Sequence, residues 1–231
     1  MKNFYVIVGC GGTGSNLAPM LSRMMDKSDV MLLIDGDTVS VSNISRQTYQ
    51  DFDVNKNKAR SLAKKLNSCY QHQHYAIDRF LTSSDDLLEI VKNYKTTDIY
   101  GGYGFKYFII AAVDNNKARL ILENAFLRML KEYNSVYYLD SGNEDTYGTL
   151  FISDKKNQVL RSKMFEMEEE APVNEHCDAL IENRNEQQYQ INLDMALAIA
   201  KVVFAIDKNS KYPISIKING FERSCIYADK D

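Results

Sequence analysis

Phe4-Tyr-Val-Ile-Val-Gly-Cys-Gly-Gly-Thr-Gly14 is the stretch of sequence that decides the fold of this chain. Its apolar run predicts a buried strand. The glycines that follow match G-x-G-x-x-G with one additional glycine at position 12, and we call residues 9–14 the glycine turn. Glycine lets the backbone approach a phosphate, and the free N–H groups at the start of the next helix attract its charge. The stretch predicts nucleotide binding without naming the nucleotide. The ordinary alternative is a tight turn that only packs strand on helix.

Outward from this turn, short apolar runs alternate with amphipathic segments, which is typical of a parallel sheet covered by helices. Strands are predicted at Phe4–Val8, Met31–Ile34, Tyr70–Ile77, Tyr107–Val113, Val136–Asp140 and Thr149–Ser153. Helices are predicted from the glycine turn to about Met25 and at Lys56–Asn67, Ser83–Asn93, Asn115–Glu132 and Asn192–Ile206. Pro19 fits if the regular helix begins near Asn16. The expected fold class is α/β: a Rossmann-like, mostly parallel sheet with helices on both faces.

The second half of the chain is less regular. Residues 155–191 form a charged, crossover-like excursion, and its acidic run Glu168–Glu170 is expected to be a solvated surface. Residues 212–228 are expected to form a C-terminal β-hairpin, because Asn219-Gly220 lies between two alternating runs. No repeat or low-complexity linker interrupts the sequence, so we expect residues 1–231 to form one domain.

Composition argues against several classes of protein. The 231 residues include 28 basic and 31 acidic side chains, and the formal charge of -3 disfavours binding of nucleic acid through a broad basic surface. The longest apolar run, Tyr107–Val113, is too short to span a membrane, and the N-terminus does not resemble a signal peptide. The cysteines at positions 10, 69, 177 and 225 form no C-x-x-C pair. We therefore expect no disulfide framework, no thiolate zinc site and a cytoplasmic location.

Polar residues follow the second predicted strand, close to the glycine turn in the expected fold. Asp35 ends that strand, where a carboxylate commonly accepts hydrogen bonds from ribose hydroxyls. The loop continues through Asn43, Arg46 and Gln47. A guanidinium makes bidentate, charge-assisted bonds to phosphate oxygens, so Arg46 favours a triphosphate over a dinucleotide.

Two further residues extend this candidate site. Lys58 begins the next predicted helix and supplies a second cation. Asp114 follows the strand Tyr107–Val113, at the edge where open α/β sheets bind ligands. A lone carboxylate there suits Mg²⁺, which takes few protein ligands. Taken singly, Arg46 could form a surface ion pair, Lys58 could be solvated and Asp114 could cap a helix. Their places at the ends of consecutive elements favour one common site.

The motifs in this order resemble the ThiF/MoeB/ubiquitin-activating (E1) superfamily. They are Gly9–Gly14, Asp35–Gln47, Val54–Lys58 and Val113-Asp114-Asn115, and the match at Asp35–Gln47 is highly specific. The resemblance extends to Asp140–Asn143 and to the C-terminal helix and hairpin, so it covers nearly the whole chain. The short length and the final hairpin look most like small bacterial ThiF-family proteins of the PRTRC-system type.

The resemblance implies an adenylyltransferase. The C-terminal carboxylate of a ubiquitin-like or sulfur-carrier protein would attack the α-phosphate of ATP, and pyrophosphate would leave. ATP and Mg²⁺ are the implied cofactors, Asp114 the implied metal ligand, and a homodimer or heterodimer the implied assembly. Arg46, Lys58 and Asp114 are the implied catalytic residues of this step. The residues implied to bind the nucleotide are Gly9, Gly11, Gly12, Gly14, Asp35, Asp37, Asn43, Arg46, Gln47 and Lys58.

Three departures from the family pattern matter. Asn55 stands where relatives often have glycine, three residues before the lysine, and Asn tolerates a left-handed backbone better than most residues. The two C-x-x-C pairs that bind structural zinc in many relatives are missing, so no structural zinc is expected. The first strand starts near residue 4, so the N-terminal arginine that completes a dimer partner's ATP site in many relatives is absent or comes from elsewhere.

Cys177 occupies the place of the catalytic cysteine of eukaryotic-type activating enzymes, with Asp178 in place of their threonine. A thiolate there could attack the acyl-adenylate and form a thioester. The ordinary alternative is an inert structural cysteine.

Two other functions stay open at this point. A catalytically degenerate E1-like scaffold would bind the nucleotide without turnover. An NAD-dependent oxidoreductase would use the same glycine turn, although Arg46, Lys58 and Asp114 argue against it.

Overall fold

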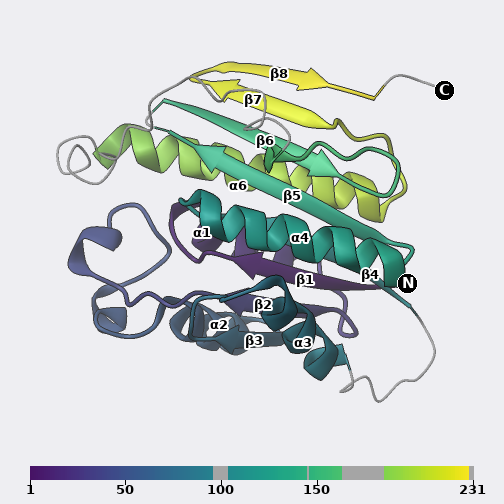
Figure 1. The fold of residues 1–231 in the computed structure, drawn as a ribbon. Coiled ribbons are helices and arrows are strands. Elements are labelled where there is room, and N and C mark those ends of the chain that lie inside the picture. The colour runs from purple at the N-terminus through teal and green to yellow at the C-terminus, as the bar shows by residue number, and fades with distance from the viewer. Residues whose placement is uncertain (96–103, 145, 163–184, 229–231) are drawn as a thin grey trace.

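The computed structural model describes residues 1–95, 104–144, 146–162 and 185–228 (Figure 1). They contain an eight-stranded sheet in the order β3-β2-β1-β4-β5-β6-β7-β8. The strands from β3 to β5 in this order are parallel, and β6, β7 and β8 continue the sheet antiparallel. The strands are β1 (Lys2–Val8), β2 (Val30–Ile34), β3 (Gln73–Ile77), β4 (Phe105–Ala111), β5 (Val136–Asn143), β6 (Tyr147–Ser153), β7 (Ser215–Asn219) and β8 (Glu222–Ile226).

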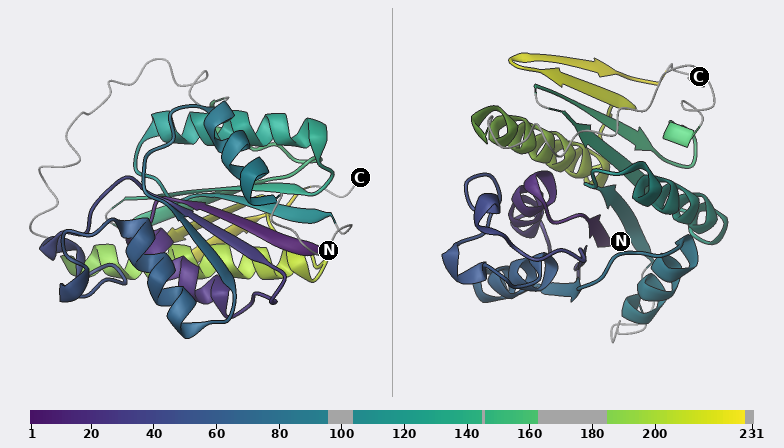
Figure 2. Two further views of the ribbon diagram at one scale, coloured as in Figure 1. Left: turned by 90° about the horizontal axis from the view of Figure 1, so that it is seen from below. Right: turned by 60° about the vertical axis from the view of Figure 1, so that its left-hand side comes forward.

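Helices cover both faces of the sheet (Figure 2). The α-helices are α1 (Gly12–Ser22), α2 (Lys58–Cys69), α3 (Ser84–Lys95), α4 (Asn116–Glu132) and α6 (Asn185–Asp207). Side chains of α1, α2 and α6, such as Leu17, Leu62 and Ile199, share one buried cluster. Side chains of α3 and α4, such as Leu87 and Phe126, belong to a second cluster on the opposite face. The expected Rossmann-like fold is confirmed.

The start of α1 differs from the prediction, and the expectation for Pro19 is wrong. The helix begins at Gly12 and not near Asn16, because the N–H of Ser15 already donates to the carbonyl oxygen of Gly11 at 2.9 Å. Pro19 therefore lies inside the helix, where it has no N–H to donate to the carbonyl of Ser15. The early start places the first helical N–H groups directly at the glycine turn.

Several other boundaries shift. β3 begins at Gln73 and not at Tyr70, because the N–H of Tyr70 still bonds to Leu66 of α2 at 2.8 Å. α6 begins at Asn185, so it includes the end of the segment predicted as a charged excursion; residues 163–184 of that segment, with its acidic run, lie outside the described ranges. The left-handed backbone predicted for Asn55 is confirmed by its φ of 65°, and Gly220, with φ 57°, makes the predicted hairpin turn.

Helix α6 is apolar because much of its surface packs into the core of the protein. On length and composition alone, Tyr189–Asp207 would be able to cross a membrane, but 56% of this stretch is buried inside the protein. Met195, Ile199 and Val203 have no exposed surface and pack in the same cluster as α1. These contacts place α6 among the helices that pack against one face of the sheet, with much of its side-chain surface in the core.

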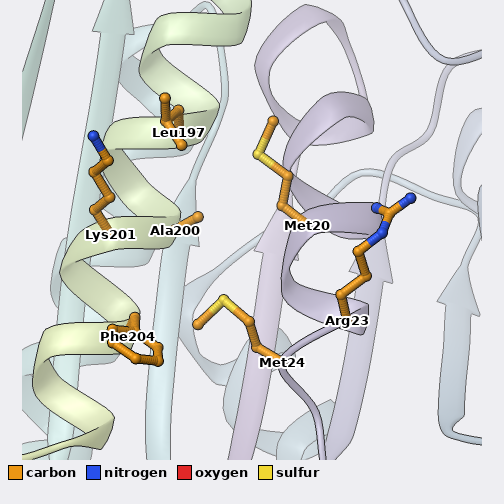
Figure 3. A pocket seen from close by; sticks show the side chains of 7 residues that line it. All are labelled: Met20, Arg23, Met24, Leu197, Ala200, Lys201 and Phe204. Carbon is orange, nitrogen blue, oxygen red and sulfur yellow. The ribbon is translucent and has the colours of Figure 1, made fainter.

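An open apolar hollow of about 360 Å³ lies on the outside of this layer, between α1 and α6 (Figure 3). Arg23 and Lys201 stand on its two sides. The apolar side chains that line it are Met20, Met24, Leu197, Ala200 and Phe204. No residue of the glycine turn lines it, so this hollow is separate from the predicted nucleotide site.

Candidate functional site

Three strand ends bring the predicted residues to one edge of the sheet. In the parallel register, Val8 of β1 is aligned with Ile34 of β2 on one side and with Ala111 of β4 on the other. The glycine turn, Asp35 and the loop that carries Asp114 leave the sheet after these three residues. The glycine turn therefore lies between the two carboxylates, at the carboxyl edge where open α/β sheets bind ligands.

Packing explains three of the four predicted glycines in the turn, but not Gly11. A Cβ at Gly9 would collide with the carbonyl of Ala112, and the φ of Gly9, 90°, also requires glycine. A Cβ at Gly14 would collide with the carbonyl of Gly9, and one at Gly12 with the side chain of Asn192. At Gly11 a Cβ would meet no atom within 4 Å in the described part of the chain. The turn is therefore open above Gly11, where a phosphate can approach the backbone.

Asp35 braces the glycine turn. Its side chain is buried; Oδ2 accepts a hydrogen bond from the N–H of Cys10 at 2.6 Å, and Oδ1 accepts one from the N–H of Asp37 at 2.8 Å. Burial raises the pKa of the Asp35 carboxyl, against the opposing effect of these hydrogen bonds. Each carboxylate oxygen can accept a second hydrogen bond. Asp35 can therefore hold the glycine turn and still accept a hydrogen bond from a ribose hydroxyl.

Lys58 is held at the start of α2 by a compact set of contacts. Its Nζ lies 3.1 Å from Oδ2 of Asp37, and the Lys58 side chain is only 11% exposed. Asn57 caps the helix by accepting from the N–H of Arg60 at 2.9 Å. Tyr49, which the sequence analysis did not single out, donates to the carbonyl oxygens of Cys10 at 2.7 Å and Lys58 at 3.3 Å. Tyr49 thus ties the glycine turn to Lys58.

The loop of Asn43, Arg46 and Gln47 is built as a local scaffold. Asn43 is buried, and its Oδ1 accepts from the N–H of Ser40 at 3.0 Å. The N–H groups of Arg46 and Gln47 both donate to the carbonyl of Asn43. Next in sequence, the N–H of Thr48 donates to Oγ of Ser15 at 3.1 Å, which fastens the loop to α1. Asn43 therefore shapes the loop backbone, and the half-buried Arg46 follows it.

Asp114 is exposed just after β4, as predicted. The alternative that it caps the next helix is wrong, because Asn115 is the N-cap of α4 and accepts from the N–H of Ala118 at 2.8 Å. Nδ2 of Asn115 also donates to Oδ1 of Asp114 at 3.2 Å. The carboxylate therefore remains accessible, which fits a Mg²⁺ ion that takes one protein oxygen and fills its other positions with water and phosphate.

A buried ion cluster contacts the loop that carries Asp114, and the sequence analysis missed it. The guanidinium of Arg119 pairs with the carboxylate of Asp140 and donates to the carbonyl of Ser141 at 2.8 Å. It also donates to the carbonyl of Val113, directly before Asp114. Nε of Arg161 donates to the other oxygen of Asp140 at 2.5 Å. The cluster fixes the Asp114 loop to the end of β5.

A second group that sequence reasoning missed lies beside the glycine turn. Oδ1 of Asn192, on α6, accepts from Nδ2 of Asn143 at 2.7 Å and from the hydroxyl of Thr13 at 3.2 Å. These residues come from the end of β5, the first turn of α1 and the last long helix. The only signal in the sequence was the similarity of the Asn143 and Asn192 segments to the family, which did not indicate that they touch.

Cys177 lies outside the described residues, so its place relative to the site stays a prediction. Cys10 is buried, and burial raises the pKa of its thiol, with Asp35 acting in the same direction. Cys69 and Cys225 are exposed. Within the described ranges, no three His, Cys, Asp or Glu side chains gather into a metal-binding group.

Residues 2–205 match the sequence model of the ThiF family. The chain belongs to the ThiF family. The matched region contains the glycine turn, the Asp35–Lys58 segment, Asp114 and nearly all of α6, so the contacts described above belong to the shared part of this ThiF-family chain. No curated protein matches the chain in sequence.

Solved structures of similar fold include two proteins. PaaA has a TM-score of 0.66 and 19% sequence identity, and MccB of E. coli has a TM-score of 0.64 and 17% identity. The comparisons cover 98% of this chain in both cases, but 65% of the PaaA chain and 63% of the MccB chain. The chain thus spans just under two thirds of the length of these proteins. MccB has also been crystallised with ATP and, as the microcin C7 biosynthetic enzyme, with N-formylated MccA. At such identities the likeness establishes the fold alone.

Proposed function

We propose that this chain adenylates the C-terminal carboxylate of a small ubiquitin-like or sulfur-carrier protein, with ATP and Mg²⁺. The observation that carries the proposal is the arrangement at one sheet edge: a glycine turn open at Gly11, the Lys58 ammonium beside Asp37, and the exposed carboxylate of Asp114. The family membership supports this reaction class, and the MccB structures with ATP and with MccA support a nucleotide and a peptide or small-protein partner.

The proposed reaction needs positioning and charge neutralisation more than acid–base chemistry. A carboxylate oxygen of the carrier attacks the α-phosphorus of ATP, the bond from that phosphorus to the pyrophosphate oxygen breaks, and an acyl-adenylate and pyrophosphate form. The N–H groups at the start of α1 bind phosphate oxygens. Arg46 and Lys58 neutralise the leaving pyrophosphate. Asp114 would hold a Mg²⁺ ion, whose charge would offset that of the phosphates.

The finer parts of the proposal rest on the sequence. We propose that the sulfur of Cys177 then attacks the acyl carbon, so that a thioester forms and AMP leaves. We also propose a cytoplasmic location and a homodimeric or heterodimeric assembly, as the family resemblance implies.

The decisive experiment is ATP–pyrophosphate exchange. The carrier to test is any small protein ending in Gly-Gly that is found encoded beside the gene for this chain. The wild type should catalyse exchange, and Asp114→Ala should lose most of it while keeping the fold, because Asp114 is exposed and caps no helix. Asp85→Ala, at an exposed carboxylate on α3, is the control and should keep full activity. A wild-type protein that binds ATP and the carrier without exchange would contradict catalysis and support the nucleotide-binding scaffold.

A further inference from the structure

Lys65, in the second half of α2, contacts the loop that connects β2 to α2. Its ammonium pairs with the carboxylate of Asp53 and donates to the carbonyl oxygen of Thr48 at 3.1 Å. The same ammonium lies 5.3 Å from the ring centre of Tyr49 and 5.3 Å from that of Phe52. An ammonium at this distance from an aromatic ring is attracted to it. One cation therefore holds both ends of one short stretch of the loop.

The ion pair between Lys65 and Asp53 is buried on the side of the carboxylate. Asp53 is 3% exposed, and its Oδ2 also accepts a hydrogen bond from the N–H of Gln50 at 2.9 Å. A buried carboxylate that loses its cation is strongly destabilised, so removal of the ammonium would loosen this part of the loop. Lys64, the preceding residue of α2, is exposed. It offers a matched comparison, because it carries the same charge on the same helix.

The stretch that Lys65 holds also contacts the predicted phosphate-binding elements. The N–H of Thr48 donates to Oγ of Ser15 at 3.1 Å, and its hydroxyl donates to Oδ1 of Asn16 at 3.1 Å. The hydroxyl of Tyr49 donates to the carbonyl oxygen of Cys10 at 2.7 Å. The loop is thus fastened between α2 on one side and α1 with the glycine turn on the other.

We propose that Lys65 is a positioning residue for ATP, which holds Thr48 and Tyr49 in place and thereby fixes the guanidinium of Arg46, two residues before Thr48, at the phosphates. This inference rests on the proposed function and deepens it. A loop without this hold would sample other positions, and the nucleotide would then have to order it on binding, which lowers the affinity. Lys65 acts through Arg46 and does not itself contact the nucleotide.

Hydrogen exchange tests the hold on the loop without any nucleotide. Lys65→Met should speed exchange of the Thr48 and Tyr49 N–H groups at least about tenfold, while the N–H groups of β1 stay protected, which separates local loosening from unfolding. Lys65→Arg should keep the protection, because it retains the cation, and Lys64→Met should also keep it. If Lys65→Met alone does not fold, Asp53→Asn is added to it, which removes the unpaired charge. Loop exchange that stays at the wild-type rate would overturn the inference.

A double-mutant cycle on ATP affinity tests whether Lys65 acts through Arg46. In titration calorimetry with ATP and Mg²⁺, Lys65→Met should raise Kd about tenfold, and Lys65→Arg at most about twofold. Lys64→Met should not change Kd. In the Arg46→Ala background, Lys65→Met should have little further effect, because the guanidinium that it positions is gone. Losses that multiply independently would mean that Lys65 has a structural role only, and would overturn the inference.

ATP–pyrophosphate exchange separates a failure of this inference from a failure of the proposed reaction. Lys65→Met should raise KM for ATP and leave KM for the carrier within about twofold of wild type. A wild type that shows the coupling of Lys65 to Arg46 in ATP binding but exchanges no pyrophosphate would count against adenylation and support the positioning role. Wild-type exchange with an unchanged KM for ATP in Lys65→Met would overturn the positioning role and leave the reaction standing.

Discussion

The side-chain amide of Asn192 lies directly against Gly12, so that a Cβ at position 12 would overlap it. This contact joins α6 to the glycine turn, although the two residues are far apart in the sequence. It accounts for the additional glycine of the motif, because a side chain at residue 12 would overlap Asn192 of α6. The glycine of the turn that remains open to a ligand is Gly11.

The contact predicts that Gly12→Ala destabilises the fold by roughly 1–3 kcal/mol, the usual cost of overpacking. The loss would come from displacing Asn192, since alanine is otherwise favourable in a helix. Adding Asn192→Ala should recover much of the loss by removing the side chain that collides. Urea unfolding of the two single variants and the double variant measures this coupling. Simple additivity of the two changes would contradict it.

Gly11→Ala is the matched comparison. Its Cβ meets nothing within 4 Å in the described structure, so stability should stay close to wild type. If the phosphates lie against Gly11, the same methyl group should weaken ATP binding. Titration calorimetry with ATP and Mg²⁺ on this variant would therefore show a binding defect without a folding defect.

The central part of the fold was largely predictable because its strands β1, β2 and β4 are continuous apolar runs between turns. β1 and β4 are buried on both faces, as the parallel arrangement requires. The helix start at Gly12 was misplaced because Pro19 suggested a later start, while the contacts of the glycine turn determined the real one. α6 was predicted too short for a similar reason: its first turns are polar, and only the structure shows them to be helical.

The candidate site was predictable where each residue follows its own strand. Asp35 and Asp114 are of this kind. The pairing of Arg119 with Asp140 and the contact of Asn192 with Asn143 depend on which strands and helices become neighbours in space. Neither pair has a periodicity or a motif that signals it. Tyr49 was missed for the same reason, because its hydroxyl bonds to backbone carbonyls that any sequence would offer.

The ion cluster predicts that replacing two arginines of helix α4 lowers the free energy of unfolding by unequal amounts. Arg119→Met should destabilise the fold by about 3–5 kcal/mol, because it removes one partner of a buried ion pair and releases the carbonyl of Val113. Arg128→Met removes an exposed pair with Asp85 and should change stability far less. Thermal and urea unfolding compare them. Equal losses would mean that Arg119 does not anchor the Asp114 loop.

His74 predicts a dependence of stability on pH. The imidazole is buried between Ser22 and Asn67, each at 2.9 Å, and burial, with a smaller contribution from His72, lowers its pKa to about 4. Between about 6.5 and 4 the unfolded chain binds this proton and the folded chain does not. The His74 contribution to stability is therefore full above pH 6.5 and falls toward pH 4, by at most about 1.4 kcal/mol per pH unit.

Urea unfolding at several pH values between 8 and 4.5 measures this slope. His74→Gln should flatten it in that window, because the amide does not titrate. His72→Gln should keep most of it. A slope that His74→Gln leaves unchanged would assign the pH dependence to other groups.

The Lys58 ammonium beside Asp37 predicts that the chain binds ATP in preference to NAD. ATP with Mg²⁺ should raise the melting temperature, because a ligand that binds only the folded state stabilises it, and NAD should do much less. Lys58→Ala should strongly reduce the rise in melting temperature that ATP causes. Lys56→Ala, two residues earlier and exposed, should not. A larger shift with NAD than with ATP would favour the oxidoreductase alternative.

Cys177 predicts that adenylation and thioester formation separate into two steps at different residues. Cys177→Ala should keep ATP–pyrophosphate exchange, because the adenylate forms at the sheet edge, and lose a covalent carrier adduct that thiols cleave. Alkylation near neutral pH should favour Cys177 over Cys10, whose thiol is buried with a raised pKa. Mass spectrometry of the trapped adduct locates the acceptor. An adduct that persists in Cys177→Ala, or that maps to the exposed Cys69 or Cys225, would assign the thioester to another residue. An adenylated carrier without any adduct would mean that the chain stops at the adenylate and passes it to a separate acceptor.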